Sequence, residues 1–240
     1  MMMKNIRLIS LSLLICLTSF CFAASKRTTV VYWNNPEATP MQQRLSENAD
    51  FWRLVPHLTT QKTQTYCGIA SAITVLNALG NSQYGDPVYY PHKYLTQDSF
   101  FTPSVLPYLS PKIVMSRGTD ITELHYALET HGVKVQTIYG DSVSAHQLRS
   151  LLSQALVNSD QYVLINYQRA CLRQRGGGHW SVLAAYDPES DRVLIMDVAR
   201  FHYLPAWVQI PDLLKAMNTI DPRGNTRGLL IVTGQPRSKA

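Results

Sequence analysis

The segment of residues 60–80 carries apolar side chains on nearly every face of a helix. Ile69, Ile73 and Leu76 recur at helical spacing, and alanines occupy much of the surface between them. A helix that is apolar almost all round lies buried, because none of its faces suits water. Gly80 marks the predicted end of the helix. The chain therefore has to fold around this helix.

Helical patterns come first along the chain, and strand patterns follow. Asp120 and Glu123 form a capping-box pattern at the start of a second predicted helix, which Gly132 ends. Apolar alternation and turn residues then indicate an antiparallel sheet. This order predicts an α+β fold, with a helical half at about 25–132 packed against an antiparallel sheet half at about 133–240. The predicted strands are residues 133–139, 162–167, 180–186, 192–198 and 228–233, and the later helices are residues 144–157 and 211–218.

Residues 1–24 have the layout of a secretory signal peptide. Two basic residues precede an apolar run at 8–22, and a pair of alanines follows. The run of about fifteen residues is short of the roughly 20 that a membrane-spanning helix needs. We expect cleavage after this segment and export, to the periplasm, of a single domain at 25–240. A lipoprotein anchor at Cys21 and an uncleaved anchor are the alternatives.

The charge balance limits the classes of partner. A net charge of +6 arises from 22 Lys and Arg against 16 Asp and Glu. An excess this small suits anionic substrates but does not indicate a nucleic-acid-binding protein. We therefore expect no nucleic acid among the partners, and no membrane once the signal segment is removed.

Two cysteines remain outside the signal segment, Cys67 and Cys171. In an exported protein they could form a disulfide. Cys67, however, begins the buried helix, where the helix N-terminus stabilises a thiolate and makes the sulfur nucleophilic. Gln61 lies six residues earlier, and its side-chain amide could donate to an oxyanion.

A second group of polar residues lies in the sheet half. His179 follows three glycines at 176–178, and Asp197 lies inside an apolar strand, where a carboxylate needs a partner. A turn centred between residues 188 and 189 places His179 opposite Val198, next to Asp197. Asp197 could then orient His179, which would take a proton from Cys67. The three residues predict a catalytic triad of the papain type.

Several short motifs resemble those of the phytochelatin synthase family, and the resemblance extends from about residue 29 to about residue 232. The pattern of Gln, Cys-Gly, His and Asp is common to many papain-like peptidases, whereas the stretch around residues 197–208 is specific. In chain order the motifs are Gln61, CGIAS at 67–71, NAL at 77–79, GH at 178–179, DVARF at 197–201 and YLPAWV at 203–208.

The resemblance implies a papain-like fold and an enzyme acting on glutathione. In this family the nucleophile takes the γ-glutamylcysteinyl group from glutathione and releases glycine, and the acyl group then passes to water or to a second glutathione, which makes phytochelatin. Arg173, Arg175 and Arg223 could hold further carboxylates and are left unranked. The resemblance implies Cys67 as nucleophile, His179 as general base and acid, Asp197 as orienting carboxylate, Gln61 as oxyanion donor, Asn166 and Gly178 along the acyl group, and Asp221 and Arg227 at the amine and carboxylate of the γ-glutamyl end.

Hydrolysis is the expected main reaction. The sequence ends at Ala240 without the Cys-rich extension of the plant enzymes, and the short bacterial members of the family look mainly like glutathione hydrolases. We expect γ-Glu-Cys as main product, with weaker transfer. No cofactor and no protein metal site are expected, because the remaining histidines show no ligand spacing. A heavy metal such as cadmium would enter as a glutathione thiolate complex, in line with a role in metal detoxification, and a homodimer is a further expectation.

Two other functions stay open at the level of sequence. One is a papain-like peptidase that processes bacteriocin leader peptides, which shares the general pattern of Gln, Cys, His and Asp. The other is a non-catalytic exported protein with a disulfide between Cys67 and Cys171.

Overall fold

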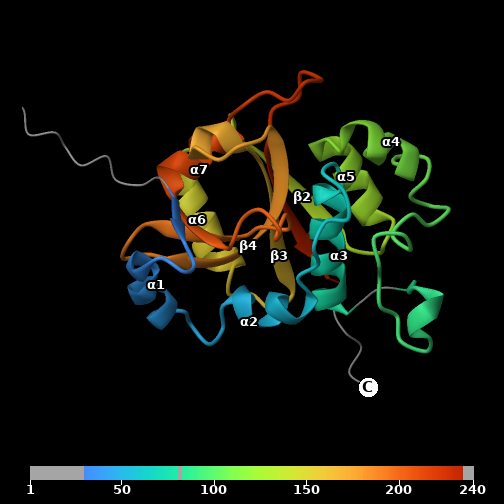
Figure 1. Cartoon of the computed structure of the whole chain (residues 1–240), viewed down its shortest axis with the longest axis horizontal. Helices are drawn as coiled ribbons and strands as arrows, with labels where there is room; N and C mark the ends of the chain where they lie inside the picture. The colour runs from blue at the N-terminus through green and yellow to red at the C-terminus, as the bar shows by residue number, and fades with distance from the viewer. Residues whose placement is uncertain (1–29, 81–82, 235–240) are drawn as a thin grey trace, which may run out of the picture.

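The computed structural model describes residues 30–80 and 83–234. Within these ranges a seven-stranded antiparallel sheet, in the order β1-β6-β5-β4-β3-β7-β2, has helices on both faces (Figure 1). The predicted signal segment lies outside the described residues. The strands are β1 (Val30–Tyr32), β2 (Lys134–Tyr139), β3 (Gln161–Gln168), β4 (Gly178–Asp187), β5 (Arg192–Met196), β6 (Ala206–Gln209) and β7 (Gly228–Thr233).

The α+β class is confirmed. None of the described helices is both long and apolar enough to span a membrane. The α-helices are α1 (Thr39–Gln43), α2 (Asp50–Leu54), α3 (Cys67–Leu79), α4 (Pro111–Arg117), α5 (Ile121–Glu129), α6 (Ala145–Ala155) and α7 (Ile210–Met217), and the short 3-10 turns are η1 (Pro36–Ala38), η2 (Val55–His57), η3 (Pro87–Tyr89) and η4 (Arg169–Leu172).

Helix α3 is the central helix that the sequence predicts. Twelve of its thirteen residues are buried, and it packs against β4. Gly80 ends it in the left-handed conformation, with φ of 65°, which glycine adopts without steric cost. The helix begins at Cys67, so the first turn holds the cysteine that the sequence singles out.

The two faces of the sheet bury two separate cores, because successive strand side chains point to opposite faces. Along β3, Tyr162 and Leu164 belong to the core beneath α3 and α5. Val163 and Ile165 belong to the core beneath α6 and α7. Figure 1 shows α3 and α5 on one side of the sheet and α6 and α7 on the other.

Three elements of the fold cross the approximate boundary between the helical half and the sheet half. Strand β1, from the first half, joins the sheet by pairing with β6. Helices α6 and α7, from the second half, cover the face of the sheet turned away from α3. The reason is that a sheet apolar on both faces needs helices on both. Strands β1 and β6 are three and four residues long, too short to show alternation in the sequence.

Candidate active site

Cys67 lies where the helix geometry favours a thiolate. The side chain of the preceding residue does not cap α3, so the first N–H groups of the helix are free to face the sulfur. Burial acts to raise the pKa of the Cys67 thiol, but the neighbouring His179 and the backbone N–H groups of Trp180 and Gly68 outweigh it. The net result is a thiol pKa lowered from its ordinary value of 9.0.

His179 lies on β4 and is joined to Asp197 by a hydrogen bond of 2.9 Å from its Nε2 to Oδ1 of the carboxylate. The second ring nitrogen is left for Cys67, with which His179 shares a hydrogen bond. Burial acts to lower the pKa of His179, and the charge of Cys67 and the bond to Asp197 raise it above its ordinary value. Both shifts favour a thiolate–imidazolium pair of Cys67 and His179.

The β4–β5 pairing differs slightly from the register that the sequence predicts. Val182 pairs with Met196, one residue beyond the expected position, and the register shifts again between Leu183 and Ala185. A bulge of this kind adds one residue to one strand. His179 still reaches Asp197, because Asp197 follows directly after the end of β5.

Asp197 is buried and has several donors besides His179. The Ala199 N–H donates to Oδ1 over 2.8 Å. Arg169 donates from Nη2 over 3.0 Å to Oδ1 and 2.8 Å to Oδ2. Burial acts to raise the pKa of the Asp197 carboxyl, but these partners hold it below its ordinary value of 3.8. The carboxylate is therefore fixed in charge and in orientation.

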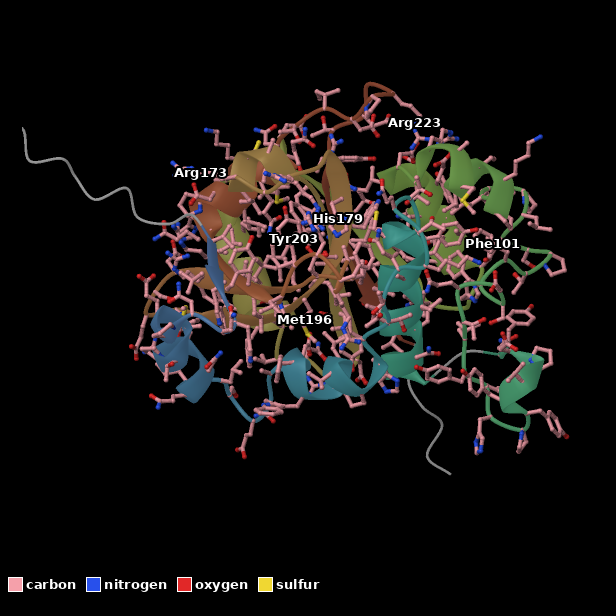
Figure 2. All side chains as sticks on the ribbon, in the orientation of Figure 1. Phe101, Arg173, His179, Met196, Tyr203 and Arg223 are labelled. Atoms are coloured by element: carbon pink, nitrogen blue, oxygen red, sulfur yellow. The ribbon has the colours of Figure 1, made fainter. Side chains whose placement is uncertain are left out.

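Arg169 is a residue that the sequence analysis missed. It is buried, donates to Gln174 over 2.9 Å and lies 4.6 Å from the ring centroid of Tyr203. The only signal in the sequence is an arginine directly after a strongly apolar strand. Its inward direction depends on the turn η4, which the pattern did not reveal. His179 and Tyr203 lie near the middle of the molecule in Figure 2.

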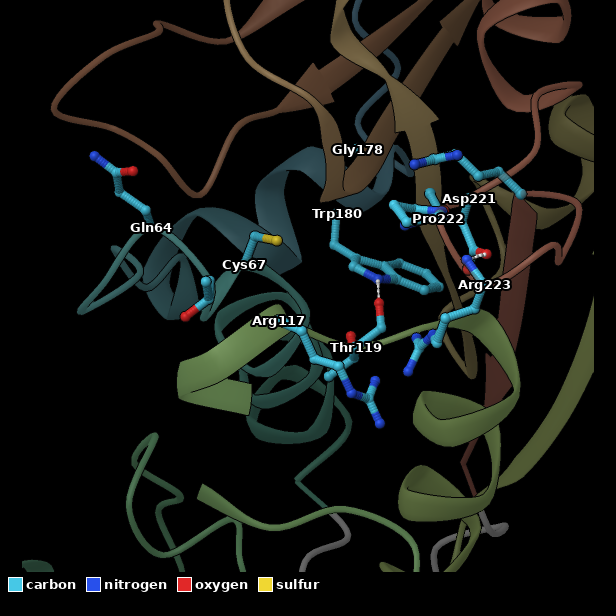
Figure 3. A pocket seen from close by; sticks show the side chains of 13 residues that line it. Gln64, Cys67, Arg117, Thr119, Gly178, Trp180, Asp221, Pro222 and Arg223 are labelled. Carbon is cyan, nitrogen blue, oxygen red and sulfur yellow. Dashed lines mark hydrogen bonds between the residues drawn. The ribbon is translucent and has the colours of Figure 1, made fainter. Parts of the chain in front are cut away.

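A cavity of about 260 Å³, cavity A, opens beside the Cys67 sulfur. Figure 3 shows the sulfur beside Trp180, whose indole N–H donates to the Thr119 carbonyl over 3.1 Å. Trp180 and Thr119 are lining residues that the sequence analysis did not identify. Of the predicted site residues, cavity A is lined by Cys67, Asn166, Gly178, Asp221 and Arg227.

Asp221 and Arg227 bring one negative and one positive charge to cavity A. Oδ1 of Asp221 accepts from the backbone N–H groups of Arg223 and Asn225 over 2.8 and 3.0 Å, which fixes the carboxylate. Arg227 is only 5% exposed. Burial lowers the pKa of its guanidinium while Asp221 acts to raise it. Within the described part of the chain its Nε and Nη1 have no hydrogen-bond partner.

Gly178 makes room for Arg227. A Cβ at this position would lie 3.0 Å from both Cζ and Nε of Arg227, and closer still to Nη2. Asn166 lies on the neighbouring strand, opposite Trp180, and its Nδ2 donates to the His179 carbonyl over 3.4 Å. Gly178, His179 and the buried guanidinium of Arg227 therefore lie close together.

A second cavity of about 320 Å³, cavity B, lies on the His179 side. Gln61 and His179 line it, and it shares Gln64 and Gly178 with cavity A. Gln61 is buried, donates its backbone N–H to Val198 over 2.9 Å and donates its side-chain Nε2 to Thr63 over 2.8 Å. One N–H of the Gln61 amide is therefore already engaged.

The eight predicted site residues thus converge on one region, with Asp197 behind His179 and cavities A and B on either side of Gly178. The structure holds both Cys67 and Cys171 as free thiols. Among the residues that the structure describes, no three His, Cys, Asp or Glu side chains cluster closely enough to hold a metal ion.

A cysteine at the start of a buried helix, facing a histidine and an aspartate on an antiparallel sheet, defines a papain-like protein. Within that class the chain belongs to the phytochelatin synthase family, whose sequence model matches residues 28–229.

Similar proteins include plant and fungal sequences. The chain is 32% identical over 185 residues to glutathione gamma-glutamylcysteinyltransferase 1 of Lotus japonicus, covering 76% of this chain and 36% of the relative. It is 33% identical to the protein of that name from Triticum aestivum, with the same coverage. The protein from Schizosaccharomyces pombe is 24% identical and is covered over 45% of its length. The chain therefore spans little more than a third of the plant relatives.

Among solved structures, the chain is similar to a double glycine motif protease from an AMS/PCAT transporter. The TM-score is 0.40 at 12% identity, with coverage of 74% of this chain and 91% of that one.

Proposed function

We propose that this protein transfers the γ-glutamylcysteinyl group of glutathione through a thioester on Cys67. Water is the main acceptor and a second glutathione the lesser one. The observation that carries the proposal is the placement of Asp221 and Arg227 in cavity A, beside the Cys67 sulfur. The γ-glutamyl end of glutathione carries an ammonium and a carboxylate on one carbon, and a fixed carboxylate beside a guanidinium matches that pair.

Recognition of the γ-glutamyl end follows from the charges. The substrate α-ammonium binds the Asp221 carboxylate, and the substrate α-carboxylate binds Arg227. Arg227 has Nε and Nη1 without a partner among the described side chains, and a buried unpartnered guanidinium is costly. A bound carboxylate would accept a hydrogen bond from this guanidinium and offset part of that cost.

Acylation begins when the Cys67 thiolate attacks the cysteinyl carbonyl of glutathione. The developing oxyanion accepts from the second N–H of the Gln61 amide and from the Cys67 backbone N–H at the start of α3. As the C–N bond breaks, the His179 imidazolium donates its proton to the departing glycine nitrogen. Asp197 holds the imidazole in place.

Deacylation reverses these roles. Neutral His179 takes a proton from water, or from the α-amine of a second glutathione, as that nucleophile attacks the thioester. The Cys67 thiolate then leaves. Water gives γ-Glu-Cys, and glutathione gives phytochelatin with one added γ-Glu-Cys unit.

Three further parts of the proposal rest on the sequence and the family resemblance. Residues 1–24 favour export to the periplasm. Metal–glutathione thiolate complexes are proposed as alternative substrates, with a role in metal detoxification. A homodimer is proposed as the assembled form.

Mass spectrometry of the products tests the proposed function. The mature protein is incubated with reduced glutathione, with and without cadmium, beside a Cys67→Ser variant. We expect glycine and γ-Glu-Cys from the wild type and neither from the variant, and longer products that increase with cadmium if transfer contributes. Intact glutathione in every reaction would contradict the proposal, and bacteriocin leader peptides would be the next substrates to test.

A further inference from the structure

We propose that Arg175 binds two α-carboxylates in turn. The first belongs to the glycine that leaves during acylation, and the second belongs to the γ-glutamyl unit of the glutathione that attacks the thioester. The inference deepens the proposed function and rests on it. It assigns cavity B to an α-amino acid unit whose nitrogen faces His179.

The two cavities divide the substrate at its scissile bond. Cavity A holds Asp221 and Arg227, whereas cavity B holds His179, and the cavities meet at Gln64 and Gly178. The general acid has to reach the leaving nitrogen. The glycine unit of glutathione therefore lies in cavity B when the γ-glutamyl end occupies cavity A.

A carboxylate in cavity B needs a cationic partner, and three arginines of this region, Arg169, Arg223 and Arg173, are engaged or distant. Arg169 also lines cavity B, but its guanidinium is engaged with Asp197 at 2.8 Å. Arg223 lines cavity A and is bound to Asp120 and Glu123 at 2.8 and 3.0 Å.

Arg173 lines neither of the two cavities described above. Figure 2 shows it on the side of the molecule where α7 lies, away from His179. It therefore does not compete for a carboxylate that is bound beside the histidine.

Arg175 has a fixed backbone and an uncommitted side chain. Its backbone N–H donates to the Tyr203 hydroxyl over 2.7 Å, and that hydroxyl lies 3.3 Å from the Arg175 carbonyl. Within the described residues the guanidinium has no hydrogen bond or ion pair. A Cβ on the nearby Gly177 would meet nothing within 4 Å, so the loop leaves space for a ligand.

One cation can serve both halves of the reaction. The leaving glycine carries its carboxylate on the carbon next to the nitrogen. The γ-glutamyl unit of an accepting glutathione attacks through its α-amine, which also has a carboxylate on the adjacent carbon. Because the attacking amine follows the path of the leaving amine in reverse, both carboxylates reach Arg175.

Glutathione and its C-terminal amide, in which the glycine carboxylate is blocked, test the inference. Release of γ-Glu-Cys is measured for the wild type, Arg175→Met, Arg175→Lys and the matched control Arg173→Met. We expect Arg175→Met to lose about 10- to 100-fold in kcat/KM for glutathione, the range for a charged hydrogen bond, and to keep the wild-type value for the amide. Arg175→Lys restores part of the loss, and Arg173→Met behaves as wild type.

Unchanged turnover of the amide also shows that Arg175→Met is folded. If Arg175→Met lowers kcat/KM equally for both substrates, or for neither, the inference is overturned while the proposed function stands. If the wild type releases γ-Glu-Cys from neither substrate, the proposed function fails and the inference fails with it.

Discussion

Replacing Gly178 with alanine should displace the Arg227 guanidinium, to which we assign the γ-glutamyl carboxylate. The new Cβ would lie 3.0 Å from Cζ and Nε of Arg227, whereas ordinary carbon contacts are about 3.5–4.0 Å. The guanidinium has to move by roughly 1 Å. Because it is the far end of a flexible side chain, the free energy of unfolding should change by less than about 1 kcal/mol.

Loss of one charged hydrogen bond costs about 1.5–3 kcal/mol, so we expect kcat/KM for glutathione to fall roughly 10- to 100-fold in Gly178→Ala. Reaction of the Cys67 thiolate with iodoacetamide, which needs no γ-glutamyl contact, should be unchanged.

A double-mutant cycle shows whether the effect acts through Arg227. In an Arg227→Met background, Gly178→Ala should cost little further activity. The reasoning is refuted if Gly178→Ala costs as much there as in the wild type, or if Gly178→Ala also slows the reaction of Cys67 with iodoacetamide.

The titrating groups and the second buried arginine give three more predictions. The pH profile of kcat/KM should be bell-shaped. Activity falls at low pH as Cys67, whose pKa is lowered, becomes protonated, and it falls at high pH as His179, whose pKa is raised, loses its proton. A profile with a single limb would argue against the ion pair. Arg169→Met should lower kcat about 10-fold with little change in KM, because the Arg169 guanidinium is bound to Asp197 and is not free to hold a substrate carboxylate. A change in KM alone would contradict that role. Burial raises the pKa of Asp50 from 3.8 to about 7 despite a paired arginine, so the folded state holds this proton more tightly than the unfolded chain. The free energy of unfolding of the wild type, relative to that of Asp50→Asn, should therefore fall as pH rises from 4 to 7, by at most about 4 kcal/mol. Urea unfolding of both proteins at pH 4 and pH 7 measures this difference, and an equal difference at the two pH values would contradict the prediction.

Local signals in the sequence predicted the elements that carry the site. Asp120 and Glu123 form the capping box of α5 with both hydrogen bonds in place. The hairpin arithmetic came within two residues of the observed β4–β5 register near the turn and within one residue of it at Val182, because a short turn fixes which residues of two strands face each other. His179 and Asp197 could therefore be paired from the sequence.

Features that depend on distant segments could not be predicted. Arg169 turns inward through η4, and Gly178 is needed because Arg227 arrives from a segment about fifty residues away. The ranking of Arg175 also depends on which cavity each arginine reaches. Contacts of this kind leave no periodic trace in a single sequence.

The central claim is that glutathione acylates Cys67. The most direct measurement is intact-protein mass spectrometry of the protein, quenched in acid within milliseconds to seconds of mixing with glutathione, followed by peptide mapping. The account predicts a γ-glutamylcysteinyl adduct on Cys67 that resists a phosphine reductant, is released by hydroxylamine as a thioester would be, and is absent from Cys67→Ser. A glutathione adduct that the reductant removes, or an acyl adduct mapped to Cys171, would contradict it.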